Sequence, residues 1–282
     1  MREGKWMERK YVARNGVTER TRFLVGRSAR PRARKSQRTT ERKQEGNRNS
    51  AAHQLGRLLN NNFTKADYFL TLEYSPAERR ALQKAAVASL PKKHTADDTR
   101  DEIMRLARQD AMLLIRRLRR LYKEQGAELR AIVVTSDMEN SGKKKANIHH
   151  HIVISGEPMK LEAKTLTICG KRPEELWGKG MTGWECLRGG SYNALASYLI
   201  KQVRDIANWK KWTCTRNLEK IVPEEYELKV GVDATEEIKI PAGSTVQERL
   251  WFGETASCQY VRYLPPAQKV KRGGHKSRRE KT

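Results

Sequence analysis

Three consecutive histidines, His149, His150 and His151, are the residues of this sequence best suited to metal chemistry. The run from Ile148 to Ser155 that contains them is rich in β-branched residues and predicts a strand. Because side chains alternate along a strand, His149 and His151 should point to one face, and His150 to the other. Two imidazoles one pleat apart can bind one divalent cation. The alternative is a set of hydrogen-bonded structural histidines.

Tyr198 and Lys201 form a second pair with chemical potential, in residues 191–206, whose apolar spacing predicts a helix. Residues three apart are neighbours on a helix, so a phenol and an ammonium group should lie together beside the sheet. Packing with a snorkelling lysine would explain an isolated pair of this kind, but nearby metal-binding histidines in a basic chain favour catalysis. Tyr192 lies about 120° from Tyr198 around the helix, which favours a structural role.

The elements that must position these residues alternate between strand and helix patterns. The sequence predicts a strand from Asp67 to Tyr74 and a long amphipathic helix from Asp98 to Gln125. It also predicts a buried strand from Ala131 to Thr135, which forms a hairpin with the histidine strand. This order predicts an α+β fold, with an antiparallel sheet and helices on one face.

Charge limits the function. The 282 residues include 58 Lys and Arg against 33 Asp and Glu, a net charge of +25, which predicts a polyanionic partner. No run approaches the ~18 apolar residues of a membrane span, so an integral membrane protein is excluded. The N-terminus lacks the apolar stretch of a secretory signal, and the four cysteines form no Cys-x-x-Cys pair. We therefore expect a cytoplasmic protein without a disulfide framework or a zinc ribbon.

Composition divides the chain into four regions. Residues 1–50 carry 16 Lys and Arg against 5 Asp and Glu, and predict a ribbon with a two-residue turn at Asn15-Gly16, followed by a flexible basic arm from Arg27 to Arg48. The other regions are a catalytic domain at 51–222, a β-rich extension at 223–265 with no assigned chemistry, and a disordered basic tail at 266–282.

Two further groups are candidates for nucleic-acid binding. Arg116, Arg117 and Arg120 lie on the polar side of the long predicted helix, where a solvated face is the alternative. Trp209 and Trp212 are interleaved with lysines and could stack on unpaired bases, with packing against the core as the alternative.

Three motifs occur in a familiar order: Phe69–Ser75 as a first strand, Ile148–Ile154 as a His-hydrophobic-His strand, and Tyr198–Lys201 as a Tyr-x-x-Lys helix. Over roughly residues 51–220 the chain resembles the rolling-circle replication initiators of the HUH endonuclease superfamily, in the versions carried by bacteria, their plasmids and their phages. One departure is His150, where the family usually has a bulky hydrophobe.

The resemblance implies an RRM-like core and a Mg²⁺ or Mn²⁺ ion bound by His149 and His151. Many members have an acidic third ligand on the strand before the histidines. Asp137 is the candidate here, with Glu139 and Glu73 in reserve.

The resemblance also implies a single-tyrosine endonuclease and strand transferase. Tyr198 would attack single-stranded DNA at a replication origin, stay joined to the 5′ phosphate and release a 3′-OH, and a later 3′-OH would reseal the strand. Lys201 would stabilise charge on the phosphate or lower the pKa of the phenol. A host helicase and polymerase are further expected partners. One alternative is a relaxase or transposase of the same superfamily. Relaxases commonly have their tyrosine before the histidine motif, and the reverse order here favours an initiator. The other alternative is a non-catalytic nucleic-acid-binding protein.

Overall fold

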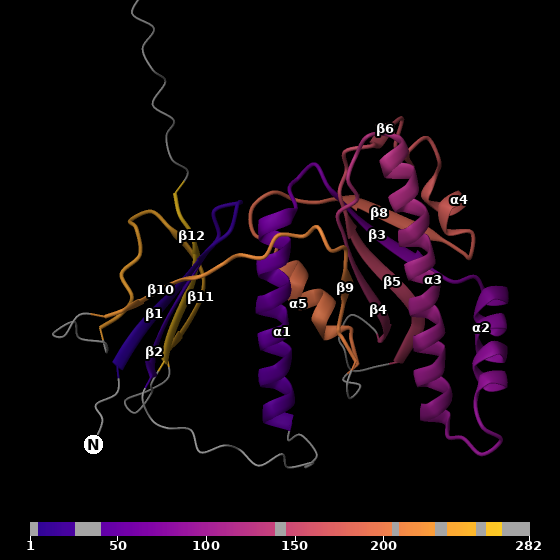
Figure 1. Ribbon diagram of the computed structural model, residues 1–282, viewed down its shortest axis with the longest axis horizontal. Helices are drawn as coiled ribbons and strands as arrows, with labels where there is room; N and C mark the ends of the chain where they lie inside the picture. The colour runs from indigo at the N-terminus through magenta and orange to yellow at the C-terminus, as the bar shows by residue number, and fades with distance from the viewer. Residues whose placement is uncertain are drawn as a thin grey trace, which may run out of the picture. The chain divides into compact units, whose positions relative to one another are not determined.

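The computed structural model describes residues 5–25, 41–138, 145–204, 209–228, 236–251 and 258–266. The chain divides into two compact units. The terminal unit is built from the described parts of Met1–Val12, Gly16–Ser28 and Pro223–Thr282, and the central unit from those of Ala13–Asn15 and Ala29–Val222. Figure 1 shows the elements of each.

The terminal unit is a five-stranded antiparallel sheet in the order β10-β1-β2-β12-β11. Its strands are β1 (Lys5–Val12), β2 (Thr18–Val25), β10 (Glu224–Glu227), β11 (Thr245–Trp251) and β12 (Cys258–Leu264). Residues 1–50 and 223–265, which composition alone separates into two regions, thus contribute strands to one sheet.

The predicted N-terminal hairpin is confirmed, but its turn is longer than two residues. Val12 pairs with Thr18, so residues 13–17 form the connection. Ala13 and Val17 are buried, at 5% and 3% exposed, instead of extending the ladder. Gly16 has a φ of 88°, which a residue without a Cβ adopts freely.

The central unit contains a second five-stranded antiparallel sheet, in the order β8-β3-β5-β4-β9, and a small sheet of two strands. The strands of the large sheet are β3 (Tyr68–Glu73), β4 (Ala131–Met138), β5 (Lys145–Ile154), β8 (Thr182–Cys186) and β9 (Thr213–Cys214), and those of the small sheet are β6 (Met159–Glu162) and β7 (Thr165–Ile168). The histidine strand β5 is therefore central, paired with β3 on one side and β4 on the other.

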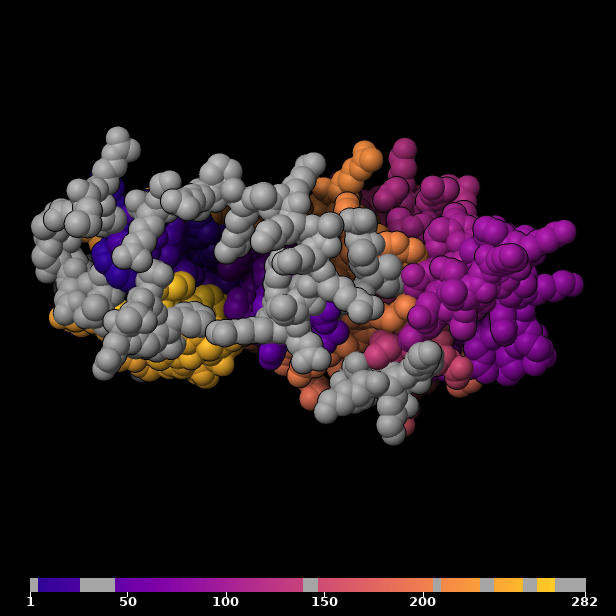
Figure 2. Space-filling view, turned by 90° about the horizontal axis from the view of Figure 1, so that it is seen from below, coloured from indigo at the N-terminus to yellow at the C-terminus, as the bar shows by residue number. Residues whose placement is uncertain are grey.

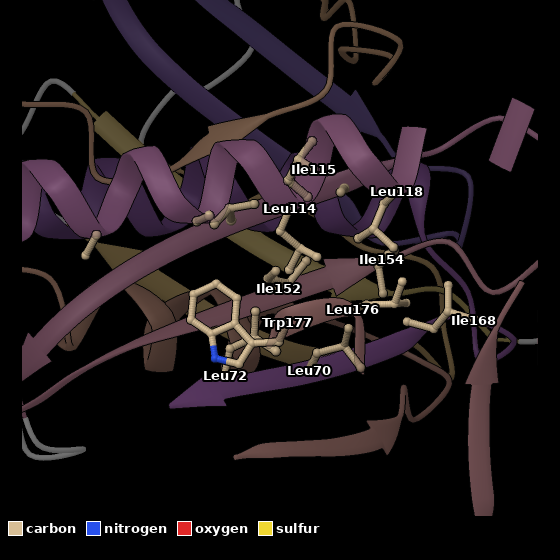
Figure 3. Packing of buried hydrophobic residues seen from close by; sticks show 14 of the residues in the cluster. Leu70, Leu72, Leu114, Ile115, Leu118, Ile152, Ile154, Ile168, Leu176 and Trp177 are labelled. Atoms are coloured by element: carbon tan, nitrogen blue, oxygen red, sulfur yellow. The ribbon is translucent and has the colours of Figure 1, made fainter. Parts of the chain in front are cut away.

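Helices cover both faces of the large sheet (Figure 1). They are α1 (Glu41–Asn62), α2 (Pro76–Ser89), α3 (Ala96–Glu124), α4 (Pro173–Trp177) and α5 (Asn193–Lys201). On one face Leu114 and Leu118 of α3 pack over Ile152 and Ile154 (Figure 3). On the other, α1 and α5 pack over Val153 and its neighbours.

The α+β class is confirmed, but the prediction of helices on one face is wrong. The strands carry apolar side chains on both faces, as consecutive Ile132, Val133 and Val134 show. Each face of the sheet must therefore be covered by helices. The predicted arm differs as well: residues 41–48 begin α1, while residues 26–40 lie outside the described residues. Residues 267–282, nearly all of the predicted tail, also lie outside them.

A candidate metal and nucleophile site

The histidine strand alternates as predicted. His150 points toward α3 and is completely buried, with Nε2 3.1 Å from the hydroxyl oxygen of Tyr74 and Nδ1 3.0 Å from Oγ1 of Thr135. Burial, together with the neighbouring His149 and His151, lowers the pKa of His150 to about 3, so this ring is neutral at pH 7. His149 and His151 project from the other face, toward α5, with ring centroids 4.8 Å apart.

Both of these histidines converge on Gln202, the residue that follows α5. The Oε1 atom of Gln202 lies 3.1 Å from Nε2 of His149 and 3.0 Å from Nε2 of His151. Gln202 is fully buried, and its main-chain carbonyl accepts a hydrogen bond of 2.7 Å from Oγ of Ser136 on β4. The helix end is thus attached to the sheet at the histidines.

The hydrogen bonds of the rings determine what their Nε2 atoms can do. The Nδ1 atom of His149 donates to the carbonyl of Asn147 at 2.8 Å, so Nε2 of the neutral ring exposes its lone pair. Nδ1 of His151 lies 3.2 Å from Oγ1 of Thr71, and burial, with His149 beside it, lowers the pKa of His151 to about 4. The neutral ring of His149 therefore turns a lone pair toward the amide oxygen of Gln202, an arrangement that an intervening cation stabilises. The Thr71 hydroxyl can donate or accept, so Nε2 of His151 either donates to the same oxygen or is left as a ligand atom.

The donor set fits a divalent cation in spacing and in chemistry. Ligand atoms at right angles and about 2.1 Å from an ion lie about 3.0 Å apart, close to the distances from Gln202 to the two rings. The Nε2 atom of Gln202 is buried and has no hydrogen-bond partner among the described residues, so that Oε1 alone carries the polar contacts of this amide. Imidazole nitrogens and a carbonyl-type oxygen are ordinary metal ligands.

Tyr198 lies one helical turn before Gln202 and adjoins the ring of His151. Its ring centroid is 5.6 Å from that of His151, and Phe69 stacks on His151 at 5.1 Å. Lys201 is exposed and is the last residue of α5. Tyr192 is buried at the start of the helix, where its N–H donates to Oδ1 of Asn60, in agreement with a structural role.

A comparison with known protein families matches the part of the chain that contains the histidines and Tyr198. Residues 67–205 match the model of a family of replication-associated proteins, the ORF2 family. The matched residues make up just under half of the 282-residue chain. The match includes β3, β5 and α5, the elements that carry the histidines and Tyr198. No curated protein and no solved structure matches the chain.

The match to the ORF2 family of replication-associated proteins confirms the resemblance to replication initiators and supports a role in replication through DNA binding. Among the described residues, no helix has the length and apolar character needed to cross a membrane.

Asp137, the predicted third ligand, does not lie beside the histidines. Alternation along β4 places Ser136 on the histidine face and Asp137 on the α3 face. There the carboxylate pairs with Nε of Arg100 at 2.5 Å and with Nε of Arg204 at 3.6 Å. The described residues contain no cluster of three His, Cys, Asp or Glu side chains suited to a metal.

The two reserve ligands have different positions. Glu73 is exposed and pairs with His149 across β3 and β5, on the histidine face. Glu139 lies outside the described residues. Gln202 is a candidate ligand that the sequence prediction lacks, because that prediction considered only acidic third ligands. Its spacing of four residues from Tyr198, which places the two on one side of a helix, is the signal that would have found it.

The candidate DNA-binding residues of the central unit separate in space. Arg116 lines a groove beside Trp209. Arg117 instead donates from Nη1 to the carbonyl of Leu176 at 2.7 Å, and Arg120 is exposed. Trp212 packs, partly buried, against the core under α1 and α5, as in the packing alternative.

Proposed function

We propose that this protein initiates rolling-circle replication by nicking single-stranded DNA at an origin. In this proposal Tyr198 is the nucleophile, and His149, His151 and Gln202 hold a divalent metal ion. The observation that supports it most is the convergence of three donor atoms beside Tyr198 on a single face of the sheet. The family of replication-associated proteins supports the biological role.

The residues around the donors prepare them for this work. Asn147 and Thr71 hold the histidine rings by their Nδ1 atoms, which leaves Nε2 of each ring for the ion. Imidazole rings and an amide bring no negative charge, so the donor set does not repel a phosphate. When bound, Mg²⁺ or Mn²⁺ would polarise the scissile phosphate and neutralise charge that develops on it.

Tyr198 and Lys201 carry the covalent step. The phenol loses its proton and its oxygen attacks phosphorus, while the bond from phosphorus to the 3′ oxygen breaks. That oxygen takes up a proton and leaves as a 3′-OH, and the DNA stays joined to Tyr198 through its 5′ phosphate. Lys201, one turn along the helix, supplies positive charge for the phosphate or the phenolate. The ester keeps its energy, so a later 3′-OH can reverse the reaction.

A nicking assay tests this proposal. Single-stranded oligonucleotides tiled across the DNA that flanks the coding sequence are incubated with the full chain and Mn²⁺, and a covalent protein–DNA band is sought on a denaturing gel. We expect Tyr198→Phe to abolish the band and to leave DNA binding nearly intact, because it removes one hydroxyl. Tyr192→Phe is the matched control and should keep the band.

The same assay separates the alternatives. A covalent band that persists in Tyr198→Phe, and is lost in Tyr192→Phe, would show that Tyr198 is not the nucleophile. Binding without any covalent product across the whole tiled set would favour a non-catalytic protein instead.

A further inference from the structure

The outer side of α3 forms one wall of an open groove in the central unit, with a volume of about 790 Å³. The other wall is the chain around Trp209, just before β9. Figure 2 shows the purple to magenta part of the chain, which includes α3, with side chains projecting into solvent. This groove is distinct from the histidine site, since α3 covers one face of the sheet and α5 the other.

The groove is strongly cationic. Arg105, Arg108, Arg116 and Lys210 line it, and among the described residues that line it there is no carboxylate. Arg116 and Lys210 are exposed and make no ion pair with any residue in the described ranges. Arg105, by contrast, is paired with Glu102. Arg116 and Lys210 therefore remain as exposed cations for a ligand.

An aromatic platform lies beside these charges. The guanidinium of Arg108 lies over the ring of Trp209, 4.6 Å from its centroid, and donates to the carbonyl of Lys210 at 2.8 Å. Those two contacts hold the indole in place between cations. Leu113, which is 56% exposed, adds apolar surface to the same groove.

We propose that this groove binds single-stranded DNA, with bases stacking on Trp209 and packing against Leu113, and with phosphates bound by Arg116 and Lys210. The proposal rests on the function proposed above and adds a second place where the substrate is held. Unpaired bases are required because the ring faces of paired bases are covered by their neighbours in the stack. From Arg105 to Arg116 the helix rises about 16 Å, enough for more than one nucleotide.

Binding measured without metal tests the groove independently of nicking. The full chain is titrated, in a chelator and at several salt concentrations, with a fluorescent oligothymidylate and with a duplex of equal length. We expect Trp209→Ala to weaken oligothymidylate binding by about tenfold or more and to change duplex binding little. Arg116→Ala should lower the salt slope of log K by about 0.7. Lys84→Ala, an exposed lysine on α2, is the control of equal charge change.

Trp209 also packs partly against the core, so Trp209→Ala could weaken binding by disturbing the fold. The Trp209→Phe variant and a measurement on the wild-type chain therefore accompany the Trp209→Ala variant. Trp209→Phe should retain most of the affinity. With the wild-type chain, an oligonucleotide containing bromodeoxyuridine should crosslink by light to the peptide that contains Trp209. Wild-type affinity in Trp209→Ala, equal losses for single strand and duplex, or crosslinks confined to other peptides would each overturn the proposal. Loss of nicking alone, with this binding intact, would count only against the function proposed above.

Discussion

The Oε1 atom of Gln202 lies 3.0 Å from the Nε2 atom of His151, although the two residues are 51 positions apart in the chain. This contact joins the end of α5 to the central strand β5. Because Tyr198 lies on the last turn of the same helix, the contact also sets the distance between the phenol and the histidine rings. In the function proposed above, this one amide side chain would couple metal binding to the placement of Tyr198.

Removal of this amide should weaken metal binding. We expect Gln202→Ala to reduce the affinity for Mn²⁺ by at least about tenfold, because one of three donors is lost, and Gln202→Glu to retain or increase it, because a charged oxygen replaces the amide. Calorimetric titration of the full chain with Mn²⁺ measures both. If Gln202→Ala bound Mn²⁺ like the wild type and Glu73→Gln did not, the reserve ligand Glu73 would be the correct one.

The three histidines should divide by face. We expect His149→Ala and His151→Ala each to abolish metal-dependent nicking in a folded protein. His150→Ala should instead cost about 1–3 kcal/mol of stability and spare metal binding, because it leaves a cavity and removes a partner of Tyr74 and Thr135. Urea unfolding and Mn²⁺ titration distinguish the two effects. Loss of Mn²⁺ binding in a stable His150→Ala variant would contradict the assigned faces.

Asp137 should act in stability and not in metal binding. Asp137→Asn leaves Arg100 and Arg204 without their shared, largely buried carboxylate, and the loss of one partner of such a pair costs up to about 3–5 kcal/mol. We expect a lower urea midpoint with unchanged Mn²⁺ affinity. The opposite pattern, normal stability with weakened Mn²⁺ binding, would restore Asp137 as a ligand.

Glu8 should make the stability of the terminal unit depend on pH. Burial raises the pKa of Glu8, but hydrogen bonds from Arg20, Arg22 and Tyr226 outweigh burial, and the net pKa lies below its ordinary value of 4.5. A lowered folded-state pKa contributes stability that is present above the unfolded value and is lost as the pH falls through the folded one.

Hydrogen exchange of the β1 and β2 amides measures this effect. Glu8→Gln should exchange faster than the wild type at pH 7, and the difference in opening free energy between the two proteins should shrink as the pH is lowered below about 4.5. A difference that stays constant from pH 7 to acid would show that the charge of Glu8 does not stabilise the sheet.

Much of the site follows from local periodicity. The alternation of His149, His150 and His151 is predictable because a strand repeats every two residues, and the proximity of Tyr198 to its helix neighbours because a helix repeats every 3.6. The antiparallel hairpin of β4 and β5 and the α+β class follow from the same patterns. These features depend on residues close together in the chain, so the sequence alone was sufficient for them.

Tertiary structure decided the remainder. Gln202 reaches the histidines only because α5 ends early, at Lys201, and docks its last turn on β4 and β5. Alternation along β4 places Asp137 on the α3 face, but its ion pair there with Arg100 depends on how α3 packs on the sheet. Trp209 meets Arg108 across about a hundred residues of chain. Such contacts depend on how distant elements pack. The residue periodicity of a single strand or helix does not determine which side chains of another element it buries or pairs with.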